Sequence, residues 1–192
     1  RKKKKVLFVG RLVPEKGVDL YVDVVKDIAH KHSDWEFGLI GSFRLGDHTI
    51  KDSFVNKVIK KFKSIGNQAK FHGFKNQDFV QEQMKTASII VIPSRWEEPF
   101  GLVAAEAMSN GIAIIASKIG GIPEIVKRNG ILIDSINKSK LHYELEGLII
   151  DTNRMKFFQK ASWDNFTLHA KKSSEKLDHI RQKILSSNFI DN

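Results

Sequence analysis

Cysteine is absent from this sequence of 192 residues. A disulfide framework and a thiolate metal site are therefore excluded, and a chain without cysteine is typical of a cytosolic protein. No apolar run approaches the length that a membrane-spanning helix needs. The hydrophobic fraction of 41% and the charged fraction of 28% instead fit a soluble globular protein whose length suits one domain. We expect a cytoplasmic location.

Several signatures of catalytic and binding sites are also missing. Neither G-x-G-x-x-G nor G-x-x-x-x-G-K-[ST] occurs, which excludes the dinucleotide-binding fingerprint and the P-loop. The histidines lack ligand-type spacing with carboxylates, so we expect no metal site. Ser94 has no evident histidine partner for a nucleophilic triad. His72 could line a crevice at the end of a predicted strand, but a structural role is the favoured interpretation.

Positive charge is in excess. The formal net charge is +10, and lysines and arginines gather at Arg1–Lys5, Lys57–Lys63 and Lys171–Lys183. Solvated helix faces are the usual meaning of such runs. An anionic partner, either nucleic acid or an acidic membrane surface, is the alternative. No aromatic-rich strand or nucleic-acid motif accompanies the lysines, so we expect no nucleic-acid partner.

The stretch Ile89–Ser117 predicts a strand–helix–strand unit around which the chain is organised. Ile89–Ile92 is a β-branched apolar run, typical of a buried strand. Phe100–Ser109 is apolar with several small residues, which predicts a helix packed closely on a sheet, and Pro99 suits its first turn. Ile112–Ala116 predicts a second buried strand.

The rest of the chain continues this alternation of strands and helices. Further strands are predicted at Lys5–Gly10, Trp35–Gly41, Ala69–Gly73 and Gly130–Ile133, and further helices around 21–28, 54–66, 79–86, 123–126 and from Ser139 onward. Strands alternating with helices predict an α/β protein with a Rossmann-like, doubly wound parallel sheet. The last predicted helix forms a helical C-terminal tail, with Leu177, Ile180, Ile184 and Leu185 as its apolar stripe.

Two carboxylates and two cations are candidate site residues. Glu98 lies after a predicted strand, at the sheet edge where α/β proteins bind ligands, and Glu106 is the lone acid of an apolar helix. A neighbouring backbone donor or a cation could instead satisfy Glu106. Arg11 and Lys16 lie in the loop after the first strand, where they would suit a diphosphate or remain solvated.

Glycines border the same predicted edge of the sheet. Gly10, Gly41 and Gly73 end predicted strands, and the pair Gly120–Gly121 lies shortly after another. Glycine allows a ligand to approach the backbone closely, although turns also require it. Together these positions outline one crevice, with Arg11 and Lys16 on one side and Glu98 and Glu106 on the other.

Several of these motifs occur in a specific order. The loop GRLVPEKG is followed by PSRWEEPFGLVAAEAMSNG, then by GGIPE and NGIL. The first is similar to a G-R-L-x-x-x-K-G loop, and the second to a P-S-x-x-E-P-F-G sequence with its E-x7-E pair. In these motifs the chain resembles the retaining GT-B glycosyltransferases of family 4, from about Val6 to about Leu185.

The resemblance implies a role for each candidate side chain. Arg11 and Lys16 would hold the diphosphate of a nucleotide-sugar and stabilise the leaving nucleoside diphosphate. Glu106 would hydrogen-bond the ribose, and Glu98 would face the donor sugar, so Glu98, Arg11 and Lys16 are the expected catalytic residues. The implied reaction transfers a hexosyl group with retained anomeric configuration and needs no metal or other cofactor.

The resemblance also implies backbone contacts. N–H groups of Phe100, Gly101 and Leu102, at a helix N-terminus, would contact sugar and phosphate. The segment His72–Phe74, which includes Gly73 and Phe74, would lie near the base.

The resemblance covers only the second of the two domains of a GT-B enzyme. We therefore expect an isolated C-terminal, donor-binding domain over residues 1–192, whose saccharide or lipid-linked acceptor would bind the absent N-terminal domain. Such a domain would transfer little sugar alone. Its basic helices would contact the inner face of a membrane peripherally, in surface-glycan or lipopolysaccharide synthesis. The alternative is a non-catalytic basic module that binds nucleic acid or an anionic membrane.

Overall fold

Six parallel strands form one sheet in the computed structural model, which describes residues 2–42, 53–167, 178–179 and 182. The strands are β1 (Lys5–Val9), β2 (Glu36–Ile40), β3 (Ala69–Gly73), β4 (Ile89–Ile92), β5 (Ala113–Ser117) and β6 (Ile131–Ile133). Their order is β3-β2-β1-β4-β5-β6, so the chain builds outward from β1 in one direction and then from β4 in the other. This is the expected Rossmann-like, doubly wound sheet.

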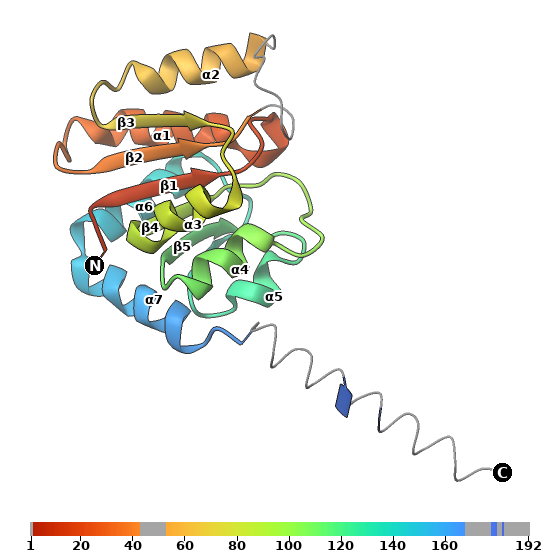
Figure 1. Cartoon of the computed structure of the whole chain (residues 1–192). Coiled ribbons are helices and arrows are strands. Elements are labelled where there is room, and N and C mark those ends of the chain that lie inside the picture. Colours follow the sequence, from red (N-terminus) through yellow and green to blue (C-terminus); the bar gives the residue numbers. More distant parts are fainter. Residues whose placement is uncertain (1, 43–52, 168–177, 180–181, 183–192) are drawn as a thin grey trace.

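Helices cover both faces of this sheet (Figure 1). They are η1 (Pro14–Lys16), α1 (Val18–Ala29), α2 (Ser53–Lys63), α3 (Gln77–Thr86), α4 (Leu102–Ser109), α5 (Ile122–Val126), α6 (Lys138–Ile150) and α7 (Thr152–Asp164). The core residues of α1, α2 and α6 pack on one face, and those of α3, α4 and α5 on the other. Each central strand is therefore buried on both sides, which explains its nearly continuous apolar sequence.

The region from residue 138 to residue 164 is helical, as the sequence predicted from Ser139 onward. It contains two helices, α6 and α7, separated at Asp151. The Asp151 carboxylate accepts hydrogen bonds from the backbone N–H groups of Asn153 and Arg154, so it caps the first turn of α7. The predicted apolar stripe of the tail and the loop at 43–50 lie outside the described residues. None of the described helices is long and apolar enough to cross a membrane.

The helix of the organising unit begins later than the sequence predicted. α4 starts at Leu102, and Phe100 lies in the preceding turn. Gly101 precedes the helix with φ 86, a left-handed conformation that separates the turn from the helix. Pro99 therefore belongs to the turn and not, as predicted, to the first helical turn.

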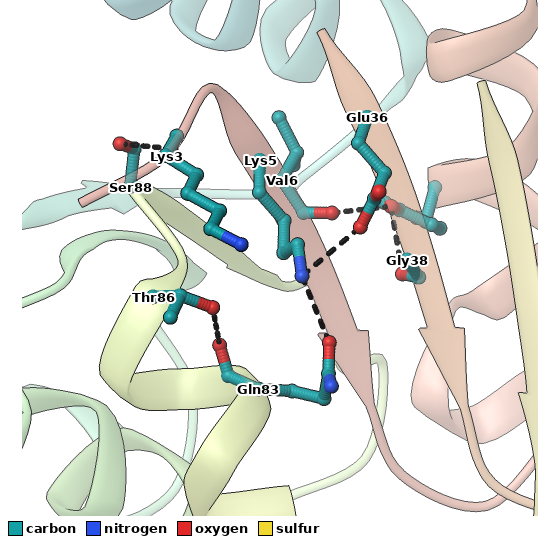
Figure 2. A network of polar contacts seen from close by, with 9 residues as sticks. Lys3, Lys5, Val6, Glu36, Gly38, Gln83, Thr86 and Ser88 are labelled. Atoms are coloured by element: carbon teal, nitrogen blue, oxygen red, sulfur yellow. Dashed lines mark hydrogen bonds and ion pairs between the residues drawn. The ribbon is translucent and has the colours of Figure 1, made fainter. Parts of the chain in front are cut away.

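The amino end of the sheet is closed by a polar network (Figure 2). The ammonium group of Lys5 lies 3.0 Å from a carboxylate oxygen of Glu36 and donates a 2.8 Å hydrogen bond to Gln83. Tyr21 donates to the carbonyl oxygens of Gly38 and Val6 at 3.0 and 3.3 Å. Burial, followed by the charge of Glu36, raises the pKa of Tyr21 well above its usual value. These contacts join β1, β2, α1 and α3 at the end opposite the carboxyl ends of the strands.

Candidate functional site

A cavity of about 500 Å³ opens at the carboxyl ends of β1 and β4. These strands are neighbours at the point where the strand order reverses, which is where open parallel sheets bind ligands. The volume lies in the range of small-molecule sites. Of the predicted site residues, those that line the cavity are Gly10, Arg11, Lys16, Gly41, Phe74, Glu98, Phe100, Gly101 and Leu102.

The loop after β1 is held against the end of β4. Pro14 begins the short 3-10 turn η1, which the sequence did not predict, and Gly17 follows it with φ 67. A Cβ atom at Gly17 would lie 2.0 Å from the carbonyl oxygen of Pro93, so only glycine permits this approach. As a result Lys16 and the exposed side chain of Arg11 both border the cavity.

Glu98 faces the same cavity from the loop between β4 and α4. Its carboxylate oxygen Oε1 accepts hydrogen bonds from the ammonium group of Lys16 and, at 3.0 Å, from the hydroxyl group of Ser94. The backbone N–H of Gly121 donates to the carbonyl oxygen of Glu98 at 2.7 Å. A Cβ atom at Gly120 would lie 2.5 Å from the backbone of Glu98, so the predicted glycine turn supports this loop closely.

The N-terminus of α4 completes the border of the cavity. Phe100, Gly101 and Leu102 all line it, and the side chains of Phe100 and Leu102 are 46% and 67% exposed. The first N–H groups of a helix have no partner inside the helix and carry the positive end of its dipole. An anionic group in the cavity would therefore meet backbone donors from α4 as well as two cationic side chains.

This geometry agrees with the comparison between the sequence and known families. The family model described as "Glycosyl transferases group 1" matches residues 1–162. The chain belongs to this family. The matched residues include all six strands of the sheet and every residue that lines the cavity.

The curated relatives that this chain matches are longer. An uncharacterized glycosyltransferase of Methanocaldococcus jannaschii is 35% identical over 89% of this chain and 48% of its own length. The fold is shared with the Anabaena protein HepE, solved in complex with UDP-glucose, at a TM-score of 0.74 and 23% identity over 96% of this chain and 49% of HepE. It is also shared with the C-terminal domain of a group 1 family glycosyl transferase, LpcC of Francisella tularensis (TM-score 0.70, 24% identity, 86% of each chain). The chain thus spans about half the length of the curated relatives that it matches.

Glu106 lies apart from the candidate residues that line the cavity. It does not line the cavity, contrary to the predicted crevice, and its carboxylate accepts a 2.7 Å hydrogen bond from the side chain of Gln77 on α3. Leu102 does line the cavity, and Glu106 follows it one helical turn later on the same face. Glu106 is therefore one turn beyond the cavity border, and the donor that satisfies it is a side chain, not the backbone group or cation that the sequence suggested.

The segment after β3 reaches the cavity through the predicted Phe74 and through Lys75, which was not predicted. Gly73 and His72 do not line it, whereas Phe74 and Lys75 do. The His72 ring packs 5.1 Å from that of Phe79, and burial, followed by the charge of Lys5, lowers the pKa of His72. Its Nε2 atom is buried without a hydrogen-bond partner in the described part of the chain. The favoured structural interpretation of His72 is consistent with this position.

Sequence reasoning missed two charged residues of this region. Lys75 lines the cavity, with its ammonium group 5.1 Å from the centroid of the Phe79 ring. Arg95 joins the two loops that carry Lys16 and Glu98. Lys75 had a weak signal, because it follows a predicted strand end, whereas no local pattern pointed to Arg95. Among the described residues, no group of three or more histidines and acids is arranged to hold a metal ion.

Proposed function

We propose that this chain is the C-terminal, donor-binding domain of a retaining GT-B glycosyltransferase of family 4. It would bind a nucleotide-diphosphate-sugar and support transfer of the hexosyl group to an acceptor. The observation that carries the proposal is the meeting of Lys16 with Glu98, beside Arg11 and the N-terminus of α4, in one cavity. Two cations and free backbone donors fit a diphosphate, and the carboxylate fits sugar hydroxyl groups.

The proposed chemistry uses these groups at the bond that breaks. When the bond between the anomeric carbon and the diphosphate breaks, negative charge develops on the diphosphate oxygen. Arg11 and Lys16 would stabilise that charge, together with the N–H groups at Phe100 to Leu102. Glu98 would orient the sugar and offset the positive charge that develops at its anomeric carbon. The two side-chain cations supply the stabilisation that a bound metal would otherwise give, so the proposal requires none.

The nucleoside part of the donor would extend along the opposite wall. Gly10 and Gly41 would let the nucleotide approach the ends of β1 and β2, and Phe74 would lie near the base. The ribose would extend slightly beyond the cavity border, where Glu106 would accept hydrogen bonds from its hydroxyl groups. Gly73 would act only through the turn that it forms after β3, where its φ is 67.

The acceptor is expected to bind elsewhere. The chain spans 48% of a curated relative and 49% of HepE, which supports a longer protein whose N-terminal domain would carry the saccharide or lipid-linked acceptor. We propose that the domain alone binds donor but transfers little sugar. A role in surface-glycan or lipopolysaccharide synthesis, with peripheral contact at the cytoplasmic face of a membrane, follows from the family resemblance.

Calorimetry and thermal shift with UDP, GDP, ADP and their sugars test the donor site directly. The proposal expects one diphosphate to bind and to stabilise the domain to the same extent with and without magnesium. Binding that requires magnesium would contradict the metal-independent site, and binding of none of the three would contradict the donor-binding function. A robust transferase rate from this chain alone would contradict the need for a second domain.

Salt titration separates this function from the alternative of a basic binding module. α2 carries Lys57, Lys60, Lys61 and Lys63 and no acidic residue, so an anionic polymer or membrane could be attracted to it. Such binding weakens steeply with salt. Binding of a single diphosphate that depends on the base and changes little with salt would favour the donor site.

A further inference from the structure

Arg95 links the two loops that carry Lys16 and Glu98. Its guanidinium group donates paired hydrogen bonds to both carboxylate oxygens of Asp19 on α1, at 2.8 and 2.9 Å. The same group donates to the carbonyl oxygen of Pro14 at 2.7 Å. One side chain of the β4–α4 loop is thus fixed to both the beginning of η1 and the helix that follows it.

The backbone of the same loop contacts η1 as well. The backbone N–H of Arg95 donates to the carbonyl oxygen of Glu15 at 2.7 Å, and the Ser94 hydroxyl lies 3.2 Å from the same oxygen. Glu15 directly precedes Lys16, whose ammonium group is hydrogen-bonded to Glu98. The position of Lys16 is therefore determined by contacts that converge on the residues immediately before it.

The Arg95–Asp19 pair itself is too exposed to matter much for stability. The side chains of Arg95 and Asp19 are 42% and 36% exposed, and exposed ion pairs contribute little to folding. Neither residue lines the cavity. A planar guanidinium group that makes three hydrogen bonds to two separate elements instead fixes geometry.

We propose that Arg95 is a positioning residue for Lys16, which it holds in place by clamping Pro14 and Asp19 against the β4–α4 loop. This inference rests on the proposed function, because Lys16 is taken to bind the donor diphosphate. Without the clamp, η1 could shift relative to the end of β4, and the Lys16 ammonium group would meet the diphosphate less often in the binding geometry.

The test is a double-mutant cycle on nucleoside diphosphate binding, with UDP, GDP and ADP as probes. For the diphosphate that binds the wild-type chain, Arg95→Ala is expected to raise the dissociation constant by about tenfold, within the range for residues that share a network. In a Lys16→Ala background, the same change is expected to alter the dissociation constant by less than about twofold. Arg95→Lys should restore binding only in part, because lysine cannot make the paired contact with Asp19.

The matched control is Arg154→Ala. Arg154 donates a 2.7 Å hydrogen bond to Glu144 in another partly exposed pair, between α6 and α7 and away from the cavity. This change should leave the diphosphate affinity unaltered. If Arg95→Ala does not fold, Asp19→Asn, which removes the charge that Arg95 contacts, replaces it in the cycle and is expected to weaken binding in the same direction.

Two results would overturn the inference while the proposed function stands. The wild-type chain binds a diphosphate, but Arg95→Ala binds it equally well; or the effects of Arg95→Ala and Lys16→Ala simply add, which would mean that Arg95 acts independently of Lys16. If the wild-type chain binds none of the three diphosphates, the proposed function itself fails, and the inference fails with it.

Discussion

The ammonium group of Lys16 donates a hydrogen bond to a carboxylate oxygen of Glu98, although the two residues are 82 positions apart in the chain. Both side chains are largely buried, at 22% and 16% exposure, and both border the same cavity. In the proposed function, an arriving diphosphate would compete with Glu98 for Lys16. Donor binding would then release the Glu98 carboxylate toward the sugar.

This competition predicts that Glu98→Gln tightens the binding of the free nucleoside diphosphate. The change removes a negative charge beside the phosphates and weakens the ion pair that holds Lys16. We expect a gain of roughly 1 kcal/mol, about fivefold in the dissociation constant measured by calorimetry. Glu97→Gln, an exposed neighbour outside the cavity, is the control. Unchanged or weaker binding by Glu98→Gln would show that the ion pair does not oppose the ligand.

The ribose role of Glu106 predicts a second, more specific effect. Glu106→Ala should weaken nucleotide binding by about 1–3 kcal/mol, the usual effect of losing a hydrogen bond to a charged group. Calorimetry with ribonucleotides and 2′-deoxyribonucleotides should show that the preference of the wild-type chain for ribose is lost in the variant. Glu82→Ala, on the exposed surface of α3, should change neither value. A ribose preference that survives in Glu106→Ala would assign the hydroxyl groups to another residue.

The buried contacts of Lys5 predict a difference between two neighbouring lysines (Figure 2). The Lys5 side chain is only 9% exposed, and it contacts Glu36 and Gln83, whereas Lys4 and Asp34 form a pair with 58% and 57% exposure. Lys5→Ala should lower the free energy of unfolding by about 1–3 kcal/mol, and Lys4→Ala by about 0–1 kcal/mol. Urea denaturation measures both.

A second variant at this position separates charge from packing. Lys5→Met keeps an apolar stem of similar length, so it should be less destabilising than Lys5→Ala. Equal losses for Lys5→Ala and Lys4→Ala would mean that the network in Figure 2 adds no more stability than an exposed ion pair.

The sequence predicted the sheet well because each strand has a local signal. The run Ile89–Ile92 coincides with β4, since a strand buried on both faces must be apolar. Ala69–Gly73 coincides with β3, although this edge strand is at most partly buried and contains Lys70 and His72. The first helical residue of α4 was less predictable. α4 begins directly after Gly101, which adopts a left-handed conformation. In the sequence alone, this glycine is equally compatible with a position inside a turn and with a position at a helix cap, so it does not show where the helix begins.

Long-range contacts in the site could not be predicted in the same way. Arg95 and Asp19 are 76 positions apart, and no local pattern indicates that an exposed arginine meets that carboxylate. The position of Glu106 beyond the cavity border depends on how α4 is rotated against α3, which is set by tertiary packing. Arg11, Lys16 and Glu98 do line one cavity, as the sequence predicted. This was predictable because the carboxyl ends of parallel strands share one edge of the sheet.

Lys2 gives a prediction about pH. Its ammonium group donates hydrogen bonds to the carbonyl oxygens of Met84 and Asn110, near the C-terminal ends of α3 and α4. Burial lowers the pKa of Lys2 from 10.5 to about 8. Between these two pH values the unfolded chain holds the proton that the folded chain has released, so this residue makes the free energy of unfolding rise with pH.

Comparison with Lys2→Gln isolates this effect from other titrations. Tyr21, whose raised pKa destabilises the fold at high pH because the phenol ionises only on unfolding, is present in both proteins and cancels. The melting temperature of the wild-type chain minus that of Lys2→Gln should therefore increase from pH 7.5 to pH 10, since a neutral amine can still donate to Met84 and Asn110 without a buried charge. A difference that stays constant would mean that Lys2 has the same proton affinity in the folded and unfolded chain.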